Sequence, residues 1–333
     1  MPIHLLPVTR RRFLSASAAT VASMSFRQRG FAEEGRADQS RFAVLSDTHL
    51  MHPDTFEDFF KTDHKNQIDK FQKNTANLKS VVNAITTSQQ SFDGMFLNGD
   101  CVHDGFPIGY PFLTQLLGEL SEKQLPLHFT LGNHDSRENF LKAVPMKNEK
   151  GGKNGLKNRH VSIIKGRLAN WFLLDSLQEG KTPGQLGVDQ LRWLKRELDA
   201  NADKPAFVMA HHNVNPSEEF HKRIGEKTTT IVRPVGKPMS LGIGLEDTDV
   251  FLDALVARKQ VKMVFSGHLH QIQIHKLKHI HFVMLPSVGY PFQPEDAVGW
   301  IDCTIKKDGA SLIMNTLDPT HEHSGKQVEL RWS

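Results

Sequence analysis

Short hydrophobic runs alternate with amphipathic helical patterns along most of the 333-residue chain. The runs Phe42–Leu45, Met95–Leu97 and Leu125–Leu131 have the length and composition of buried strands. Apolar residues at helical spacing between these runs predict helices over Asn66–Thr86 and Phe112–Leu120. This order of strand, helix, strand, helix and strand favours a core sheet whose strands run parallel.

The second half of the chain is richer in strands. His160–Ile164 and Leu168–Leu174 flank a short turn and predict a β-hairpin. The pattern then predicts a helix over Val188–Leu198, a strand at Ala206–Ala210, a helix over Asp247–Arg258 and a strand at Val261–Ser266. The polar segment Asn213–Leu245 is too long for an ordinary connection. Such a segment is usually functional or mobile.

No domain boundary is evident between Arg41 and Leu317. We therefore predict one domain over residues 41–317. A linker over residues 33–40 would precede it, and residues 318–333 would form a C-terminal tail.

The first 32 residues have the layout of an export signal. Arg10, Arg11 and Arg12 precede Phe13 and Leu14, and a weakly apolar run with small residues near its end follows. The paired arginines resemble a twin-arginine signal, which predicts export to the periplasm or the extracellular space. The mature protein would then start near Glu33. An amphipathic N-terminal helix that stays attached is the alternative interpretation.

The formal net charge of +4 originates in this segment. It holds five of the 41 lysine and arginine residues and no acidic residue, so 36 basic residues face 37 acidic ones in the rest of the chain. A nearly neutral body has no electrostatic reason to bind nucleic acid. Two cysteines are too few for a disulfide framework or a cysteine-rich zinc module. The chain contains no run of about 18 apolar residues, so the sequence predicts no membrane-spanning helix.

Five of the predicted strands end abruptly in aspartate, asparagine or histidine. These polar ends are Ser46–His49, Asn98–Asp100, Gly132–Asp135, His211–His212 and Ser266–His270. Ligands bind beyond the carboxyl ends of strands in open α/β sheets, so we expect the five ends to line one crevice. A single end of this kind is often only a helix cap, a turn or a surface histidine pair. The five together indicate a metal site.

The donors in these segments are oxygen and imidazole, with no thiolate. Such a set suits Mn, Fe or Zn. There are too many ligands for one ion, which favours two divalent or trivalent metal ions bridged by a carboxylate.

The five segments resemble, in order, the conserved blocks of calcineurin-like metallophosphoesterases. The matching residues are Asp47 and His49, Gly99 and Asp100, Gly132 to Asp135, His211, and Gly267 to His270. The resemblance spans about residues 41–290. It implies an α/β (mixed α+β) fold, a four-layer α-β-β-α sandwich in which two mixed sheets face each other. Residues 184–194 and 286–290 are similar to the class III cyclic-nucleotide phosphodiesterase branch, whereas Cys101 and His103 are variations of this chain.

The resemblance also implies a role for each matching residue. Asp47, His49, Asp100 and His270 would hold the first metal ion, and Asp100, Asn133, His211 and His268 would hold the second. Asp100 would bridge the two ions. His212 is the alternative to His211. His134 would lie beside the phosphate, and Asp135 would orient His134.

These roles imply hydrolysis of a small-molecule phosphoric ester. A hydroxide bridging the two ions would attack phosphorus in line, and His134 would protonate or stabilise the departing oxygen. The leading interpretation is a phosphodiesterase that acts on cyclic nucleotides or on a broad range of diesters. The alternatives are a phosphomonoesterase of the same family and a non-catalytic scaffold that kept the fold. Three segments are expected to control selectivity between monoesters and diesters: residues 51–67, 147–159 and 213–245. The twin-arginine export machinery is the expected protein partner.

Several further residues allow two interpretations. His52 and His64 could reach substrate or be solvated, and the basic residues Lys222, Arg223, Lys227 and Arg233 could hold a phosphate or be solvated. Cys101 and Cys303 are expected to be buried thiols, with a disulfide between them as the alternative.

Overall fold

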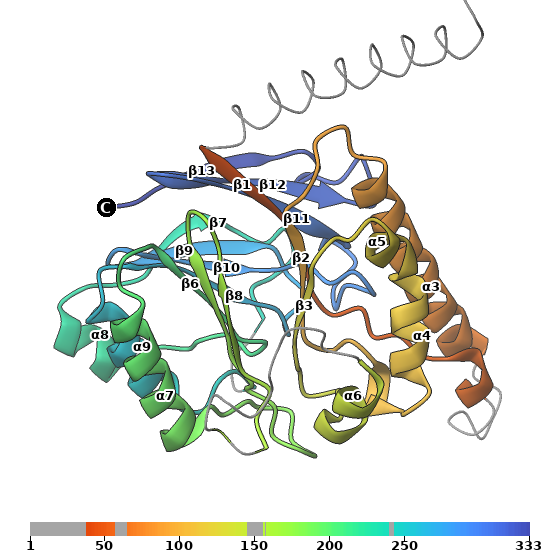
Figure 1. The fold of residues 1–333 in the computed structure, drawn as a ribbon, viewed down its shortest axis with the longest axis horizontal. Helices are drawn as coiled ribbons and strands as arrows, with labels where there is room; N and C mark the ends of the chain where they lie inside the picture. The colour runs from red at the N-terminus through yellow and green to blue at the C-terminus, as the bar shows by residue number, and fades with distance from the viewer. Residues whose placement is uncertain (1–37, 57–64, 145–155, 157, 240–242) are drawn as a thin grey trace, which may run out of the picture. The chain divides into compact units, whose positions relative to one another are not determined.

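Two β-sheets form the centre of the fold, in a computed structural model that describes residues 38–56, 65–144, 156, 158–239 and 243–333 (Figure 1). The first sheet has the strand order β13-β12-β11-β1-β2-β3. Its strands are β1 (Gln39–Leu45), β2 (Gly94–Asn98), β3 (Leu127–Thr130), β11 (Gly299–Lys306), β12 (Gly309–Thr316) and β13 (Gln327–Arg331). β1, β2 and β3 run parallel, as the sequence predicts, whereas β11, β12 and β13 pair antiparallel.

The second sheet has the order β4-β5-β6-β8-β10-β9-β7. Its strands are β4 (Ser162–Lys165), β5 (Asn170–Leu173), β6 (Ala206–Met209), β7 (Thr229–Val232), β8 (Val261–Ser266), β9 (Gln273–Leu277) and β10 (Ile280–Met284). β5, β6, β8 and β10 run parallel at its centre. The predicted hairpin is the antiparallel pair β4 and β5.

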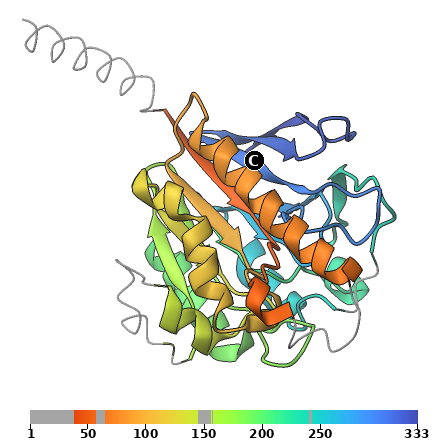
Figure 2. The same cartoon turned by 90° about the vertical axis from the view of Figure 1, so that its right-hand side faces the viewer.

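Helices cover the outer faces of both sheets. Among the described residues before position 145, the α-helices are α3 (Lys65–Thr86), α4 (Gly109–Leu116), α5 (Gly118–Glu122) and α6 (Arg137–Ala143). The later ones are α7 (Gly187–Ala200), α8 (Glu218–Ile224) and α9 (Thr248–Val256). Figure 2 shows α3 lying along the outer face of the first sheet, and Figure 1 shows α7 and α9 beside the second sheet. The resulting α-β-β-α order confirms the four-layer sandwich that the sequence predicts.

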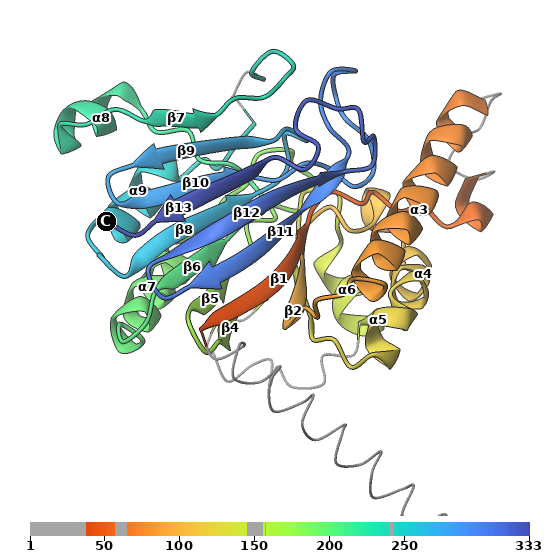
Figure 3. The same cartoon turned by 90° about the horizontal axis from the view of Figure 1, so that it is seen from above.

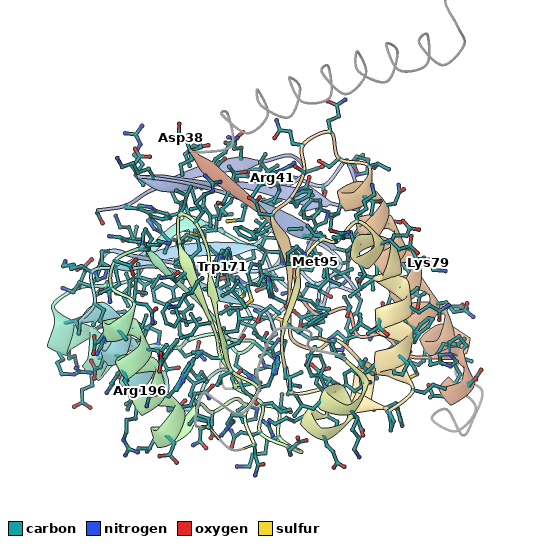
Figure 4. All side chains as sticks on the ribbon, viewed as in Figure 1. Asp38, Arg41, Lys79, Met95, Trp171 and Arg196 are labelled. Carbon is teal, nitrogen blue, oxygen red and sulfur yellow. The ribbon has the colours of Figure 1, made fainter. Side chains whose placement is uncertain are left out.

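Figure 3 shows the first sheet lying over the second. A large apolar core lies between the two sheets. Its centre is aromatic: the Trp171 ring stacks on Phe96 at 4.1 Å between ring centroids and on Phe265 at 5.3 Å. Figure 4 labels Trp171 in this interior and Lys79 and Arg196 at the periphery. Rings from both sheets therefore fill the space between them, because large aromatic side chains bury the most apolar area per residue.

One further apolar core lies between each sheet and its helices. Leu78, Val81 and Val82 of α3 pack on the outward residues of β1 and β2. Leu191, Leu194 and Leu198 of α7 recur at helical spacing and pack on the second sheet. None of the helices in the described part of the chain has the length and apolar composition of a membrane span.

The structure corrects three predictions about elements. The helix expected over Phe112–Leu120 is two helices, because Gly118 is a poor helix former and lies at the junction. The segment Asn213–Leu245 contains α8 and β7, and β7 pairs with β9 at the edge of the second sheet. Residues 318–333 are not a tail, because β13 pairs with β12 and buries Leu330.

Other predictions fall wholly or partly outside the described residues. These are the export signal over residues 1–32, most of the linker over 33–40, His64, and parts of the three segments expected to control selectivity.

Candidate metal centre

The five polar strand ends meet at one place, although they come from two sheets. β1, β2 and β3 of the first sheet lead into Asp47, Asp100 and Asn133. β6 and β8 of the second sheet lead into His211 and His268. Backbone hydrogen bonds tie neighbouring ends together: Asp47 N donates to Gly99 O at 3.1 Å, and Gly267 N donates to His211 O at 2.9 Å. The expected convergence of these residues is therefore present.

The backbone of these loops is locally strained. The left-handed φ angles are 55° at Asp47, 41° at His49, 46° at Asp100, 69° at His268 and 53° at His270. Side-chain-bearing residues seldom adopt this region, at a cost of order 1–3 kcal/mol each. Such conformations persist at functional sites, where the surrounding structure holds them. Here they turn each side chain inward directly after its strand.

Two glycines let the loops approach each other closely. A Cβ atom on Gly132 would lie 2.2 Å from Oδ1 of Asp100. A Cβ atom on Gly267 would lie 2.5 Å from Oδ2 of Asp47, and closer still to the Ser46 hydroxyl. No side chain fits at either position, which explains why glycine precedes the ligand residues in both segments.

One group of three donors consists of Asp47, His49 and His270, all buried. Nε2 of His270 lies 3.2 Å from Oδ1 of Asp47 and 3.1 Å from Nε2 of His49. A second group consists of Asp100, His211 and His268, and its three ligand atoms also lie within 4.8 Å of one another.

The carboxylate of Asp100 lies between the two groups. Its Oδ2 atom is 3.5 Å from Nε2 of His49 and 3.3 Å from Nε2 of His211. Its Oδ1 atom accepts a hydrogen bond from the backbone N–H of His134 at 2.8 Å. This position suits a carboxylate that bridges two cations.

Two buried atoms at this place lack a hydrogen-bond partner among the described residues. They are Oδ1 of Asn133 and Nε2 of His211. Buried polar atoms without a partner are rare in folded proteins, and an ion is one of the things that satisfies them. The donor set and these two atoms therefore fit a metal site.

In three of these histidines, the ring nitrogen on the side away from the site lies near a backbone carbonyl oxygen. Nδ1 of His211 lies 2.8 Å from Asn98 O, Nε2 of His268 lies 3.0 Å from Ile243 O, and Nδ1 of His270 lies 2.6 Å from Tyr290 O. Metal-ligating histidines usually donate their second N–H in this way, which fixes the ring and its tautomer. The other ring nitrogen of each histidine faces the site and is the one that would bind a metal ion.

His212 does not share this arrangement. Its Nδ1 lies 2.8 Å from the Ser176 hydroxyl, and its Nε2 lies 3.0 Å from Thr182 O. Both ring nitrogens are occupied by groups away from Asp100, so the geometry favours His211 over His212 as a ligand.

The comparisons with known proteins agree with this geometry. The family model described as calcineurin-like phosphoesterase matches residues 40–272. The chain belongs to the calcineurin-like phosphoesterase family. It is a metal-dependent hydrolase of phosphoesters.

This phosphoesterase is similar to cyclic-nucleotide phosphodiesterases in sequence. A protein of Synechococcus named "probable cyclic nucleotide phosphodiesterase" is 30% identical over 227 residues, which cover 67% of this chain and 75% of that protein. The 3',5'-cyclic adenosine monophosphate phosphodiesterase CpdA of Pseudomonas aeruginosa is 27% identical over 219 residues, which cover 65% and 68%. The crystal structure of a dimetal phosphatase from Danio rerio superimposes with a TM-score of 0.62 at 13% identity, covers 88% of this chain and 99% of the other, and shows the shared fold.

The charges in the phosphoesterase site favour a cation. Burial alone would lower the pKa of His211, but the negative charges of Asp100 and Asp47 outweigh it and raise the pKa to about 10. Burial, aided by the charge of His211, lowers the pKa of His268 to about 4. The two carboxylates thus create a field that holds one positive charge strongly and leaves the neighbouring imidazole neutral.

Asp135 does not orient His134 as expected. Its two carboxylate oxygens accept hydrogen bonds from the backbone N–H groups of Cys101, Val102 and Gly132 at 3.0–3.2 Å. The carboxylate beside the His134 ring is that of Asp104, whose Oδ1 lies 3.4 Å from Nδ1 of His134. Asp135 instead holds the second and third strand ends together, because a buried carboxyl group needs hydrogen-bond partners.

The prediction from sequence missed several residues that surround the site. His103 and Asp104 lie beside His134, and Tyr290 lies 5.0 Å from His49 between ring centroids. The ammonium of Lys70 lies 3.3 Å over the Tyr290 ring. The departure of His103 from the family pattern was the one sequence signal for this group.

Other candidates have structural roles. Nδ1 of His52 accepts a hydrogen bond from Asp54 N, and Arg223 forms an ion pair with Asp253 at 2.6 Å. Cys101 and Cys303 are buried free thiols, so the alternative of a disulfide is wrong.

Proposed function

We propose that this phosphoesterase hydrolyses small phosphodiesters, with cyclic nucleotides as the first candidates, and that two metal ions assist the reaction. The observation that carries the proposal is the bridging position of Asp100, whose Oδ2 lies within 3.5 Å of both His49 and His211. The similarity to the two phosphodiesterases supports the diester as substrate.

Seven side chains would hold the ions. Asp47, His49, Asp100 and His270 would hold the first ion, and Asp100, Asn133, His211 and His268 the second. Bound ions of the Fe, Mn or Zn type would supply an activated water and neutralise phosphoryl charge. Asn133 contributes a neutral oxygen, which keeps the total negative charge of the second ligand set low.

His134 is placed to donate a proton to the leaving group. Its side chain is about one-third exposed, whereas six of the seven proposed ligands are buried and Asn133 is half-buried. Burial lowers the pKa of His134, but the hydrogen bond to Asp104 and the charge of Asp100 raise it overall. With Nδ1 directed at Asp104, Nε2 remains to donate a proton to the departing oxygen, a contribution typically worth about 10²–10⁴-fold.

The test is a substrate panel on protein loaded with Mn, Fe or Zn in turn. We expect turnover of bis(p-nitrophenyl) phosphate and of 3',5'-cyclic AMP to exceed turnover of p-nitrophenyl phosphate. His134→Ala should keep its metal content and lose most of its turnover of 3',5'-cyclic AMP, because the departing alkoxide needs a proton. Faster turnover of the monoester would favour the phosphomonoesterase alternative, and unchanged turnover of 3',5'-cyclic AMP in His134→Ala would refute the role of His134.

We also propose that the protein is exported by the twin-arginine route and acts in the periplasm or outside the cell. The support is the sequence Arg10-Arg11-Arg12-Phe13-Leu14 followed by a weakly apolar run. Replacing Arg10, Arg11 and Arg12 with lysine should leave the protein in the cytoplasm of the producing cell. Unchanged fractionation of that variant would argue against export by this route.

A further inference from the structure

His103 and Asp104 connect the metal ligand His49 with His134. Nδ1 of His103 lies 3.3 Å from Nδ1 of His49. The carboxylate of Asp104 lies beside two imidazoles. Its Oδ1 is 3.4 Å from Nδ1 of His134, and its Oδ2 is 4.0 Å from Nε2 of His103. The His103 ring stacks on the His134 ring at 4.8 Å between centroids and an interplanar angle of 17°.

The backbone holds Asp104 in this place. Asp104 has a left-handed φ of 54°, and Gly105 after it has a φ of 59°. Aspartate and asparagine tolerate this conformation better than other residues with a side chain. The short turn His103–Gly105 therefore aims two neighbouring side chains at one site, which a regular helix or strand does not do.

The hydrogen positions in this cluster are mutually consistent. Nε2 of His49 faces Asp100 and His270, so its Nδ1–H is the group that donates to His103. His103 accepts at Nδ1 and therefore carries its proton on Nε2, the atom that faces Asp104. With Nδ1 of His134 directed at Asp104, its Nε2 is the ring nitrogen left to act on the leaving group.

We infer that His103 and Asp104 are positioning residues, a pair in which His103 fixes the tautomer of the metal ligand His49 and Asp104 fixes that of His134. The inference rests on the proposed function. A metal-ligating histidine commonly donates its second N–H to a carboxylate or carbonyl, and in this chain an imidazole takes that place. Asp104 orients His134 in the same cluster, whereas its Oδ2, 4.0 Å from Nε2 of His103, is too far away for a direct hydrogen bond to that ring.

The role of His103 is tested with two complementary variants. His103→Phe keeps a ring that can stack on His134 but loses the nitrogen that accepts from His49. His103→Asn keeps an acceptor at about the position of Nδ1 but loses the ring. Metal affinity is measured for each full-length variant by competition of Mn or Zn with a chelator, so the readout does not depend on turnover.

We expect His103→Phe to weaken metal binding by about 10–100-fold, the usual cost of losing a partner of a metal-ligating histidine. His103→Asn should stay within a few-fold of the wild type. Circular dichroism and thermal melting confirm that both variants fold. Equal metal affinity in the two variants, whether high or low, would overturn the assignment of His103.

The role of Asp104 is tested with Asp104→Asn, which tolerates the left-handed backbone. Diesters are compared whose leaving groups range from p-nitrophenolate to a simple alkoxide. A p-nitrophenolate needs no proton to depart, so kcat/KM for it should change little. The alkoxide requires a proton, so its kcat/KM should fall by about 10²-fold or more, in line with the contribution of a general acid.

A uniform loss across the series would mean that Asp104 acts only on folding or binding, and would overturn its assignment. Failure of the proposed function gives a different result. If the wild type binds metal but hydrolyses no diester, the diesterase proposal fails, while the metal competition still decides the role of His103.

Discussion

Oδ2 of Asp100 lies 3.3 Å from Nε2 of His211, and these two residues come from different sheets. Asp100 follows β2 of the first sheet, and His211 follows β6 of the second. Both side chains are buried, and the histidine nitrogen has no hydrogen-bond partner in the described part of the chain. The site therefore depends on the packing of one sheet against the other, and not on either sheet alone.

Asp100→Asn should empty both metal positions. The amide lacks the charge that attracts the cations, and its nitrogen cannot bind them. We expect the loss in metal affinity to exceed about 100-fold, because 10–100-fold is already typical when only a partner of a ligand is changed. Elemental analysis after dialysis measures the metal content. The same change at the exposed Asp54 is the control, and full metal content in Asp100→Asn would contradict the bridging role.

Gly132→Ala should disturb the site through a single methyl group. The added Cβ would lie 2.2 Å from Oδ1 of Asp100, so the carboxylate or the loop must move. We expect reduced metal content and a loss of activity of about 10²-fold, since an error of about 1 Å in placement can cost that much. Gly118→Ala is the matched control, because a Cβ there meets nothing within 4 Å. Equal activity in both variants would argue against close approach at Gly132.

Arg137→Ala should destabilise the fold. Arg137 Nε lies 2.6 Å from Oδ2 of Asp175, which is fully buried. Removing Arg137 leaves the buried charge of Asp175 with only the more distant Arg159, 3.9 Å away, as counter-ion, which costs up to about 3–5 kcal/mol in the free energy of unfolding. Urea denaturation measures this value. The exposed pair of Lys142 and Glu138 is the comparison, and Lys142→Ala should cost about 1 kcal/mol or less. Similar losses in the two variants would contradict the prediction.

His128 should make the fold less stable in acid. Burial lowers its pKa to about 4, whereas a histidine in the unfolded chain has a pKa of about 6.5. Between these values the unfolded chain binds more protons, so stability is lost as the pH falls from about 6.5 toward 4. The slope is at most about 1.4 kcal/mol per pH unit.

His128→Phe should reduce this loss while keeping the ring contact with Phe96, which is 4.9 Å between centroids. Denaturation of the wild type and the variant at pH 7 and pH 5 measures the difference. Any loss of metal at pH 5 affects both proteins alike and cancels in the comparison. Equal pH dependence in the two proteins would show that His128 does not contribute.

Much of the fold could be predicted from the hydrophobic pattern. The pattern of period 3.6 predicted α3 and α7 to within a few residues, and the short apolar runs predicted β1, β2, β6 and β8. The helix α8 inside the segment Asn213–Leu245 could have been predicted, because Ser217 and Gly225 are typical residues for the start and the end of a helix. In the structure Ser217 caps α8, and Gly225 ends it with a φ of 68°. β7 was not predictable, because three of its four residues are exposed and only pairing with β9 makes it a strand.

The sequence by itself determined which residue types follow each strand, and therefore the donor set and the family. It did so because strand ends and turn glycines are local features that a short stretch of chain encodes. The tertiary structure decided which carboxylate lies beside the imidazole of His134. Asp135 is next to His134 in sequence, yet its oxygens are taken up by the backbone N–H groups of Cys101, Val102 and Gly132. Asp104, thirty residues earlier, occupies the place beside His134 because the end of β2 packs against the end of β3.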